Sequence, residues 1–319
     1  PEELRRKIAL FCNVRSDCVV ECQDADSIYK VPLILHEQGF DRILCDKLNI
    51  WTAAPELERW RHISQVLDSP QKRCRIGIVG KYTNVVDSYK SINEALVHAG
   101  IANHAKVSVE FVDAGDIDEA NVEQKLRGFG GVIVPGGFGE RGVEGKITAI
   151  QHVRREGVPF LGICLGMQLA AVEIARHLLK LPDANSQEFG EKSQNQVIHL
   201  MESQHGVKDK GGTMRLGAYP CVLRRGTTTY KAYENQEISE RHRHRFEFNN
   251  DYRDAFERNG VTFAGTSPDD RLVEILEISD HPWFVGCQFH PELKSSPMNP
   301  HPLFRDFLAA AVSHGSEAQ

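Results

Sequence analysis

The chain has 319 residues and a formal net charge of −6, and 41% of its residues are hydrophobic while 26% are charged. This balance is typical of a globular protein with a sizeable core, built as two domains or as one large domain with an appendage. It argues against a nucleic-acid-binding protein, which would usually be basic, and no apolar run is long enough for a membrane helix.

The N-terminal part is predicted to contain one short buried strand and two helical segments. Residues 8–14 form an apolar run that favours the strand, and residues 26–38 show a helical pattern that Pro32 interrupts. A second helical pattern at 55–67 runs into a polar, basic segment that is typical of a linker. Because the chain begins with Pro1 instead of methionine, we expect a processed chain or a fragment of a longer protein.

Apolar runs alternate with amphipathic segments in the middle of the chain. The alternation predicts strands at 75–80, 106–114, 131–137 and 158–164, and helices at 87–100, 121–128, 143–157 and 166–179. This order favours a mostly parallel sheet with helices on both faces.

The second half of the chain has a different pattern, with strand-like segments and few helices between them. The predicted strands are 214–223, 227–233, 244–249, 261–267, 272–279 and 283–289. They favour an antiparallel portion joined to the parallel sheet. The final polar residues, 313–319, are predicted to be a mobile tail.

The strongest local motif is Gly-Ile-Cys-Leu-Gly at 162–166, between a predicted strand and a predicted helix. This is the pattern of a nucleophile elbow, in which two glycines allow close chain approach at a strained turn. The turn would project the thiol of Cys164 above the sheet edge, where the following helix favours a thiolate. The alternative is a buried structural cysteine between two turn glycines.

A second motif follows the last predicted strand, where His290 and Glu292 flank Pro291. With one residue between them, both side chains lie on the same side of an extended chain. A histidine held by a carboxylate can activate a nucleophile and then protonate a leaving amine. Alone, the motif reads as a surface turn, so the catalytic interpretation depends on its combination with Cys164.

Two further segments could contribute to binding. The loop Pro-Gly-Gly-Phe-Gly at 135–139 could supply oxyanion-hole amides or cradle a phosphate, although it lacks the spacing of a nucleotide fingerprint. In Arg-His-Arg-His-Arg at 241–245, a strand would place the arginines on one face and the histidines on the other. The arginines suit a carboxylate, and a solvated charged strand remains the alternative.

The eight cysteines form no C-x-x-C pair, and the N-terminus lacks the pattern of a signal peptide. We therefore expect reduced thiols, a cytoplasmic location and no structural zinc site.

Six segments, in this order along the chain, resemble the class I glutamine amidotransferase domain of the CTP synthase family: PGGFG, GICLGMQLA, ANSQEF, GGTMRLG, ERHRHRFEFN and CQFHPE. The elbow and the His-x-Glu pair are shared by all class I glutaminases, whereas GGTMRLG and RHRHRFE are narrower. The resemblance covers nearly the whole chain. It implies an α/β, flavodoxin-like fold with a mostly parallel central sheet, flanking helices and an antiparallel portion.

The resemblance also implies a domain organisation. Residues 1–50 are similar to the end of the synthase domain, 51–73 would be a linker, and 74–319 would be the glutaminase domain. The phosphate-binding loop and the acidic magnesium ligands of such enzymes belong to a part of the synthase domain that precedes residue 1.

By motif, the resemblance implies Cys164 as the nucleophile, His290 as general base and acid, and Glu292 as the partner that orients His290. It implies oxyanion-hole donors at Gly137 and Leu165. The implied glutamine contacts are Gly137, Leu165, Gly166, Met167, Gln168, Glu188 and Arg245. The motif departs from the family where Pro291-Glu292-Leu293 replaces the usual Pro-Glu-Phe, which we interpret as a packing change.

Nucleotide contacts are implied as well. Lys7 resembles a lysine that contacts UTP or CTP, and Gln23, Asp24 and Ala25 resemble a segment that lines the ATP adenine. Phe138 and Arg141 lie in a region that resembles the one through which GTP activates these enzymes. The chain itself is expected to bind no cofactor, metal, nucleic acid or membrane. Mg²⁺ with ATP and a homotetrameric assembly are expected only of the full-length enzyme.

The predicted function is hydrolysis of glutamine to glutamate and ammonia. The full-length enzyme would use that ammonia in the ATP-dependent amination of UTP to CTP. Two alternatives stay open: another class I amidotransferase such as GMP synthetase, or an assembly fragment with no catalytic role.

Overall fold

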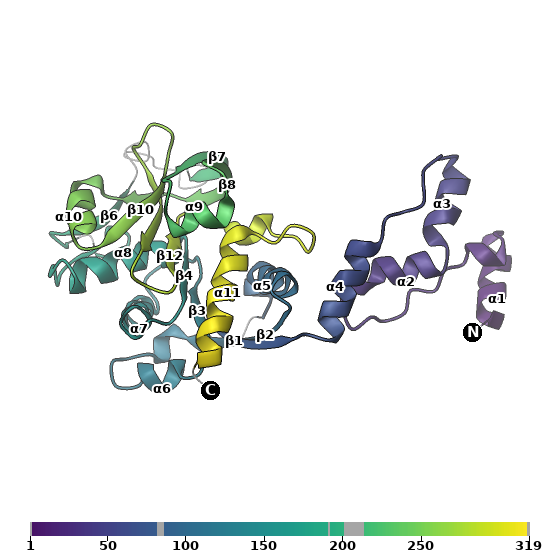
Figure 1. Cartoon of the computed structure of the whole chain (residues 1–319), viewed down its shortest axis with the longest axis horizontal. Helices are drawn as coiled ribbons and strands as arrows, with labels where there is room; N and C mark the ends of the chain where they lie inside the picture. Colours follow the sequence, from purple (N-terminus) through teal and green to yellow (C-terminus); the bar gives the residue numbers. More distant parts are fainter. Residues whose placement is uncertain (1, 82–85, 191, 201–213, 318–319) are drawn as a thin grey trace. The chain divides into compact units, whose positions relative to one another are not determined.

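The computed structural model describes residues 2–81, 86–190, 192–200 and 214–317, and its helices and strands are labelled in Figure 1. It divides into two compact units, Pro1–Gln71 and Lys72–Gln319. Residues 51–71 belong to the first unit. The division into 1–50, 51–73 and 74–319 therefore stays a prediction, because the structure separates the chain at one point only.

The regular elements among the described residues of the first unit are all helices, including two short 3₁₀ turns at Ser16–Cys18 and Ile28–Lys30, and irregular segments connect them. Its four α-helices are α1 (Glu2–Cys12), α2 (Val31–Glu37), α3 (Phe40–Leu48) and α4 (Glu58–Asp68). Lys30 bonds to Asp26 at 2.8 Å and also to Asp68, which ties the second 3₁₀ turn to the end of α4.

Two sequence predictions for this unit are wrong. The apolar run at 8–14 is not a strand but the end of α1, because short apolar runs do not distinguish the two structures. The helix is favoured by acidic residues in its first turn and by i,i+4 pairs such as Lys7–Glu3 at 2.9 Å. Pro32 does not interrupt a helix at 26–38 but begins α2, where its missing N–H costs no helical bond.

The second unit is built on a nine-stranded sheet with the order β2-β1-β3-β4-β12-β11-β10-β7-β8. The first five strands in this order pair in parallel and the remaining pairs are antiparallel. The strands are β1 (Lys72–Gly80), β2 (Ala105–Asp113), β3 (Gly131–Val134), β4 (Phe160–Ile163), β7 (Arg215–Leu223), β8 (Glu237–His244), β10 (Val261–Thr266), β11 (Val273–Ile278) and β12 (Phe284–Cys287). The predicted α/β fold with a parallel and an antiparallel portion is confirmed.

Helices cover both faces of the sheet, and a separate buried core lies on each face. One core includes residues of α7 and α8, and the other includes residues of α5 and α11, which lie side by side in Figure 1. The helices are α5 (Lys90–Ala102), α6 (Val122–Leu126), α7 (Val143–Glu156), α8 (Leu165–His177), α9 (Thr228–Tyr233), α10 (Arg253–Arg258) and α11 (Pro302–Glu317). Helix α7 ends at Gly157, whose φ of 69° is the left-handed conformation that favours glycine.

A small second sheet joins β5 (Asn185–Ser186), β6 (Gln196–Leu200) and β9 (Phe246–Phe248) in that order. Strand β9 follows β8 after a single residue, Arg245, so the arginine-rich segment ends between the two sheets. This position brings Arg245 toward the segment that carries Glu188, whose carboxylate interacts electrostatically with it.

Two predictions for the second unit are also wrong. Residues 227–233 are not a strand, because the Thr227 hydroxyl caps α9 and the Glu277 carboxylate accepts the N–H groups of Thr228 and Thr229. The predicted mobile tail at 313–319 is wrong for residues 313–317, which belong to α11, and residues 318–319 lie outside the described residues. The sequence analysis also missed α10 and most of α11.

Candidate active site

The candidate nucleophile lies at the sharp turn between β4 and α8. Cys164 has φ 53° and ψ −102°, and the residue is only 4% exposed. A side chain on Gly166 would begin 2.0 Å from the Val134 carbonyl oxygen, so only glycine lets α8 pack this close to β3. The strain of a positive φ at a non-glycine residue is therefore imposed by the packing around it.

The candidate base follows β12, which is the parallel neighbour of β4. The His290 Nδ1 atom lies 2.7 Å from Glu292 Oε1, and Nδ1–H is the natural donor to that carboxylate. This hydrogen bond occupies Nδ1, so the other ring nitrogen, Nε2, is the one that can exchange a proton with Cys164. Burial lowers the pKa of His290, but hydrogen bonds with Cys164 and Glu292 outweigh burial and raise it to about 10. The imidazole is thus positioned beside the thiol, where it can accept a proton and later donate it.

These side chains share one cavity of about 440 Å³. Its walls come from the start of α5, the loop after β3, the elbow, β8 and the segment after β12. Twelve residues line it: Ser88, Tyr89, Ser91, Ile92, Pro135, Gly136, Gly137, Phe138, Cys164, Arg243, His290 and Glu292. A side chain on Gly136 would begin 3.0 Å from His290 Cε1 and 3.5 Å from Cys164 Cβ, so this glycine gives the nucleophile and the base their space.

The glycine-rich loop after β3 is held from two sides. The Lys81 ammonium donates to the Phe138 carbonyl at 2.8 Å and also to the carbonyl of Gly139. The N–H of Gly139 donates to Glu188 Oε1 at 3.0 Å. Burial raises the pKa of the Glu188 carboxyl. Glu188, expected to contact glutamine, thus lies beside the loop that borders the thiol.

Four of the predicted glutamine contacts, Leu165, Gly166, Met167 and Gln168, lie in the first turn of α8 and are buried, whereas Arg245 lies between β8 and β9. Leu165 Cδ2 is 3.6 Å from where a Gly137 side chain would begin, so the two predicted oxyanion-hole residues are neighbours. Met167 packs against Gly286 of β12. The Gln168 amide donates to the Phe246 carbonyl and to Gln288 Oε1, both at 3.1 Å, so its side chain is already bonded within the protein.

Strand β8 alternates as predicted, with Arg241 and Arg243 exposed and His242 and His244 buried. The Arg243 carbonyl lies 3.9 Å from Cys164 Sγ, and the arginine itself lines the cavity.

The two residues expected to respond to GTP are exposed. Phe138 is on the cavity wall, and Arg141 forms an ion pair with Asp113 at 3.5 Å.

The predicted nucleotide contacts lie in the first unit. Lys7 is on the exposed side of α1, where it pairs with Glu3. Gln23, Asp24 and Ala25 lie in the irregular segment between the two 3₁₀ turns.

Buried side chains of the two narrow sequence motifs meet in a polar network on the other face of β8 from Arg243. Arg215 Nη1 lies 2.6 Å from Glu274 Oε1, and His242 Nδ1 lies 2.9 Å from His244 Nε2. Burial, aided by Arg215, lowers the pKa of His242 to about 2 and that of His244 to about 3. Residues 211–213 of the GGTMRLG segment lie outside the described residues.

Sequence reasoning missed three residues of the site: Lys81 and Lys146, which lie beside the glycine-rich loop, and Gln288, which lies beside the thiol. The Gln288 amide lies 3.8 Å from Cys164 Sγ. Lys146 could have been found, because it interrupts the apolar face of a predicted helix that also carries Val143 and Ile150.

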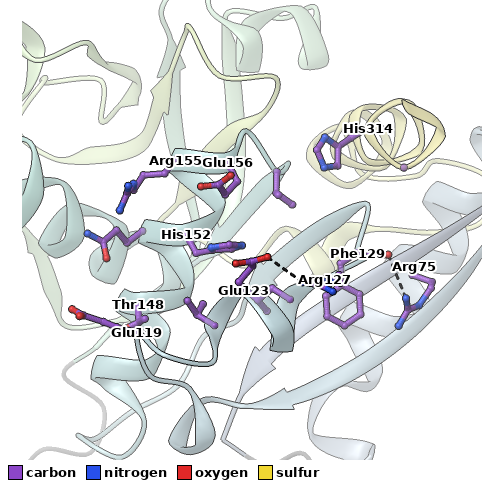
Figure 2. Close-up of a pocket in the computed structure, with 16 residues that line it drawn as sticks. Arg75, Glu119, Glu123, Arg127, Phe129, Thr148, His152, Arg155, Glu156 and His314 are labelled. Atoms are coloured by element: carbon purple, nitrogen blue, oxygen red, sulfur yellow. Dashed lines mark hydrogen bonds and ion pairs between the residues drawn. The ribbon is translucent and has the colours of Figure 1, made fainter. Parts of the chain in front are cut away.

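A larger hollow, of about 1000 Å³, lies elsewhere on the second unit (Figure 2). Charged side chains of both signs surround it, and Arg127 pairs with Glu123 at 3.1 Å. None of the predicted site residues lines it. The smaller cavity at Cys164 is therefore the better candidate for chemistry.

The described residues contain no group of three or more His, Cys, Asp and Glu side chains arranged to hold a metal ion. Within the same residues, no helix combines the length and the apolar character that crossing a bilayer requires.

Comparison with known proteins gives consistent matches along the chain. Residues 84–310 match the family "Glutamine amidotransferase class-I", and residues 1–50 match "CTP synthase N-terminus". A CTP synthase of Geotalea uraniireducens is 55% identical over 313 residues, which are 98% of this chain and 59% of that protein. A CTP synthase of Geobacter metallireducens is 53% identical, with the same coverage. The chain thus spans about 59% of the length of these relatives.

One solved structure is similar throughout the second unit's fold. It is the glutaminase domain of a Trypanosoma brucei CTP synthase with bound acivicin, at 35% identity and a TM-score of 0.71. The alignment covers 75% of this chain and 94% of that domain.

Proposed function

The chain belongs to the CTP synthase family and carries its class I glutamine amidotransferase domain, and from this we propose that Cys164, His290 and Glu292 hydrolyse glutamine. The observation that carries the proposal is their convergence on one cavity from two adjacent parallel strands. A strained elbow holds the thiol, and a carboxylate holds the imidazole at 2.7 Å.

The first half of the reaction forms a thioester. The Cys164 thiolate attacks the side-chain carbonyl of glutamine, and His290 holds the proton that the thiol has lost. The tetrahedral oxyanion is bonded by backbone N–H groups of Gly137 and Leu165. As the C–N bond breaks, His290 donates its proton to the leaving nitrogen, and ammonia departs.

The second half restores the enzyme. His290 accepts a proton from water, the resulting hydroxide attacks the thioester carbonyl, and the C–S bond breaks to give glutamate and the thiolate. Glu292 keeps the Nδ1–H of His290 fixed in both halves, so Nε2 serves first as acid and then as base. The net reaction consumes one water and yields glutamate and ammonia.

We assign the substrate contacts on the same basis. Contacts beside Leu165 would come from the first turn of α8, at Gly166, Met167 and Gln168. The amino group of glutamine would bind to Glu188, and its carboxylate would bind to Arg245. The electrostatic interaction between Glu188 and Arg245 supports this pairing, because glutamine carries both charges on one carbon.

For the whole protein we propose the ATP-dependent amination of UTP to CTP, in the cytoplasm and as a homotetramer. Lys7 would contact UTP or CTP, Gln23 to Ala25 would line ATP, and Phe138 and Arg141 would respond to GTP. The described residues offer no cluster that fits Mg²⁺, so no step on this chain is assigned to that ion. The CTP synthase match at residues 1–50 favours this acceptor over that of GMP synthetase.

Acivicin provides a direct test, because the similar Trypanosoma brucei domain was solved with this compound bound. Incubation of the chain with acivicin, followed by peptide mass spectrometry, is expected to find the adduct on the peptide containing Cys164. Wild type should carry the adduct and Cys164→Ala should not, and excess glutamine should slow the labelling of wild type. Equal labelling of both proteins would contradict the proposal and favour a role in assembly alone.

A further inference from the structure

A lysine is buried inside the first turn of α7, directly behind the glycine-rich loop. Lys146 is 1% exposed and is among the largest fully buried side chains of the protein. In the part of the chain that the structure describes, no carboxylate lies within ion-pairing distance of its ammonium. Burial of a charge without a partner is costly, and lysine is rarely buried in this way.

The ammonium of Lys146 is directed toward the candidate oxyanion hole. Its Nζ atom lies 3.9 Å from the point where a Gly137 side chain would begin, and Leu165 Cδ2 lies 3.6 Å from the same point. The lysine and the elbow leucine thus flank Gly137 together. Burial and the nearby charge of Lys81 together lower the pKa of Lys146 to about 7, although the interaction with Cys164 acts in the opposite direction.

Neighbouring charges do not explain the position of this lysine. Lys81 is engaged with the loop carbonyls of Phe138 and Gly139. Glu144, on the same helix, pairs with Arg176 at 2.7 Å. Among the described residues, the group whose charge favours the ammonium form of Lys146 is Cys164, at the reacting centre. A methionine would fill the same volume without the cost of burying a charge.

We propose that Lys146 is a positioning residue of glutamine hydrolysis, whose buried ammonium supports the negative charge of the tetrahedral intermediate from behind Gly137. The inference rests on the proposed function, since it assigns a role within that reaction. An ammonium in a dry site acts strongly at short range and needs no reorganisation during the reaction. It would act through the loop, and Gly137 would keep the direct hydrogen bond to the oxyanion.

The test compares Lys146→Met with Ile147→Met in the 319-residue chain. Both variants place methionine at a buried position of the same helical turn, but only the first removes a charge. For Lys146→Met we expect kcat for glutamine to fall about 10- to 100-fold, with KM changed less than about twofold. Ile147→Met should keep the wild-type kcat. Thermal unfolding should show Lys146→Met at least as stable as wild type, because a buried charge has been removed.

The combination of lower kcat with undiminished stability is the distinguishing result, because a structural role would lower both. Lys146→Gln provides a second neutral variant, with the same expectation for kcat. Wild-type kcat in either neutral variant would overturn the inference and leave the proposed function intact. Absence of glutamine hydrolysis in wild type would instead contradict the proposed function itself.

Discussion

Cys164 is the residue where local conformation and chemistry are most tightly linked. Its φ of 53° is unusual for a residue with a side chain, and such a conformation costs about 1–3 kcal/mol. Close packing of Gly162 and Gly166 against neighbouring backbone leaves the turn no relaxed alternative. The sequence predicts this turn well, because few local structures besides an elbow require glycines around a cysteine between a strand and a helix.

The role of Glu292 leads to a prediction at the same scale. Glu292→Gln keeps the size of the side chain but presents an amide to His290, which no longer favours the Nδ1–H tautomer. We expect kcat for glutamine hydrolysis to fall by about 100-fold or more, with little change in KM. Steady-state measurement of glutamate release checks this result.

Leu293 supplies the matched control for that variant. It is the neighbouring residue and is 51% exposed, so a larger apolar side chain can be accommodated there. Leu293→Phe should therefore retain wild-type kcat. Near-normal activity of Glu292→Gln would show that the carboxylate does not orient the base.

At the scale of elements, the strand–helix alternation from β1 to α8 was predictable because its signals are strong. Strands β3 and β4 and the second half of β1 are buried on both faces, β2 alternates between exposed and half-buried positions, and Gly157 marks the end of α7. The prediction failed at α1 and α9, where the deciding interactions are local charges or a distant carboxylate. The Glu277 side chain that caps α9 comes from β11, and no window of sequence around residue 228 contains it.

The candidate site shows the same limit. Cys164 and the His290–Glu292 pair were found because each has a compact motif, but their meeting depends on β4 and β12 being sheet neighbours. Lys81 and Lys146 carry no motif, and only the folded chain brings them to the loop at Gly137. The RHRHR segment was interpreted through its arginines, whereas its histidines form part of a buried network on the other face of β8.

That network gives β8 a pH-dependent stability. The folded pKa of His242, about 2, lies below the unfolded value of about 6.5, so the unfolded chain binds more protons between these values. The contribution of His242 to the free energy of unfolding therefore rises with pH through this range, and at pH 5 keeping His242 neutral costs about 2 kcal/mol. His242→Gln should show a weaker rise between pH 4.5 and pH 7 than wild type in urea denaturation.

The control for this prediction is Ser239→Ala, at an exposed position of the same strand. It removes no titratable group, so it should keep the wild-type dependence of unfolding free energy on pH. If His242→Gln and wild type show the same slope, His242 is not held neutral in the folded protein.

At the scale of the whole molecule, the two units differ in how well they bury apolar side chains. The first unit leaves large residues such as Phe11 and Trp51 almost fully exposed, at 87% and 98%. The second unit has a core on each face of its sheet. Exposed apolar side chains in such number are typical of a surface that contacts another part of a protein.

A truncation tests the independence of the units. Residues 72–319 alone are expected to unfold cooperatively, within about 5 °C of the transition of the second unit in the whole chain, because their core is self-contained. Binding of a fluorescent apolar dye should fall, since the exposed residues of α1 are removed. The unfolding temperature is measured from intrinsic tryptophan emission during heating. Dye binding is measured separately at a temperature where both proteins are folded. Failure to fold would show that the first unit completes the core of the second.

The most direct test of catalysis by Cys164 is the detection of a covalent intermediate. Glutamine would be mixed with the chain, the reaction quenched in acid within milliseconds to seconds, and the intact protein and its peptides weighed by mass spectrometry. We predict a γ-glutamyl thioester on Cys164 that accumulates in wild type and is absent in Cys164→Ala. Release of glutamate without any adduct on residue 164, or with an adduct on another cysteine, would contradict the proposed mechanism.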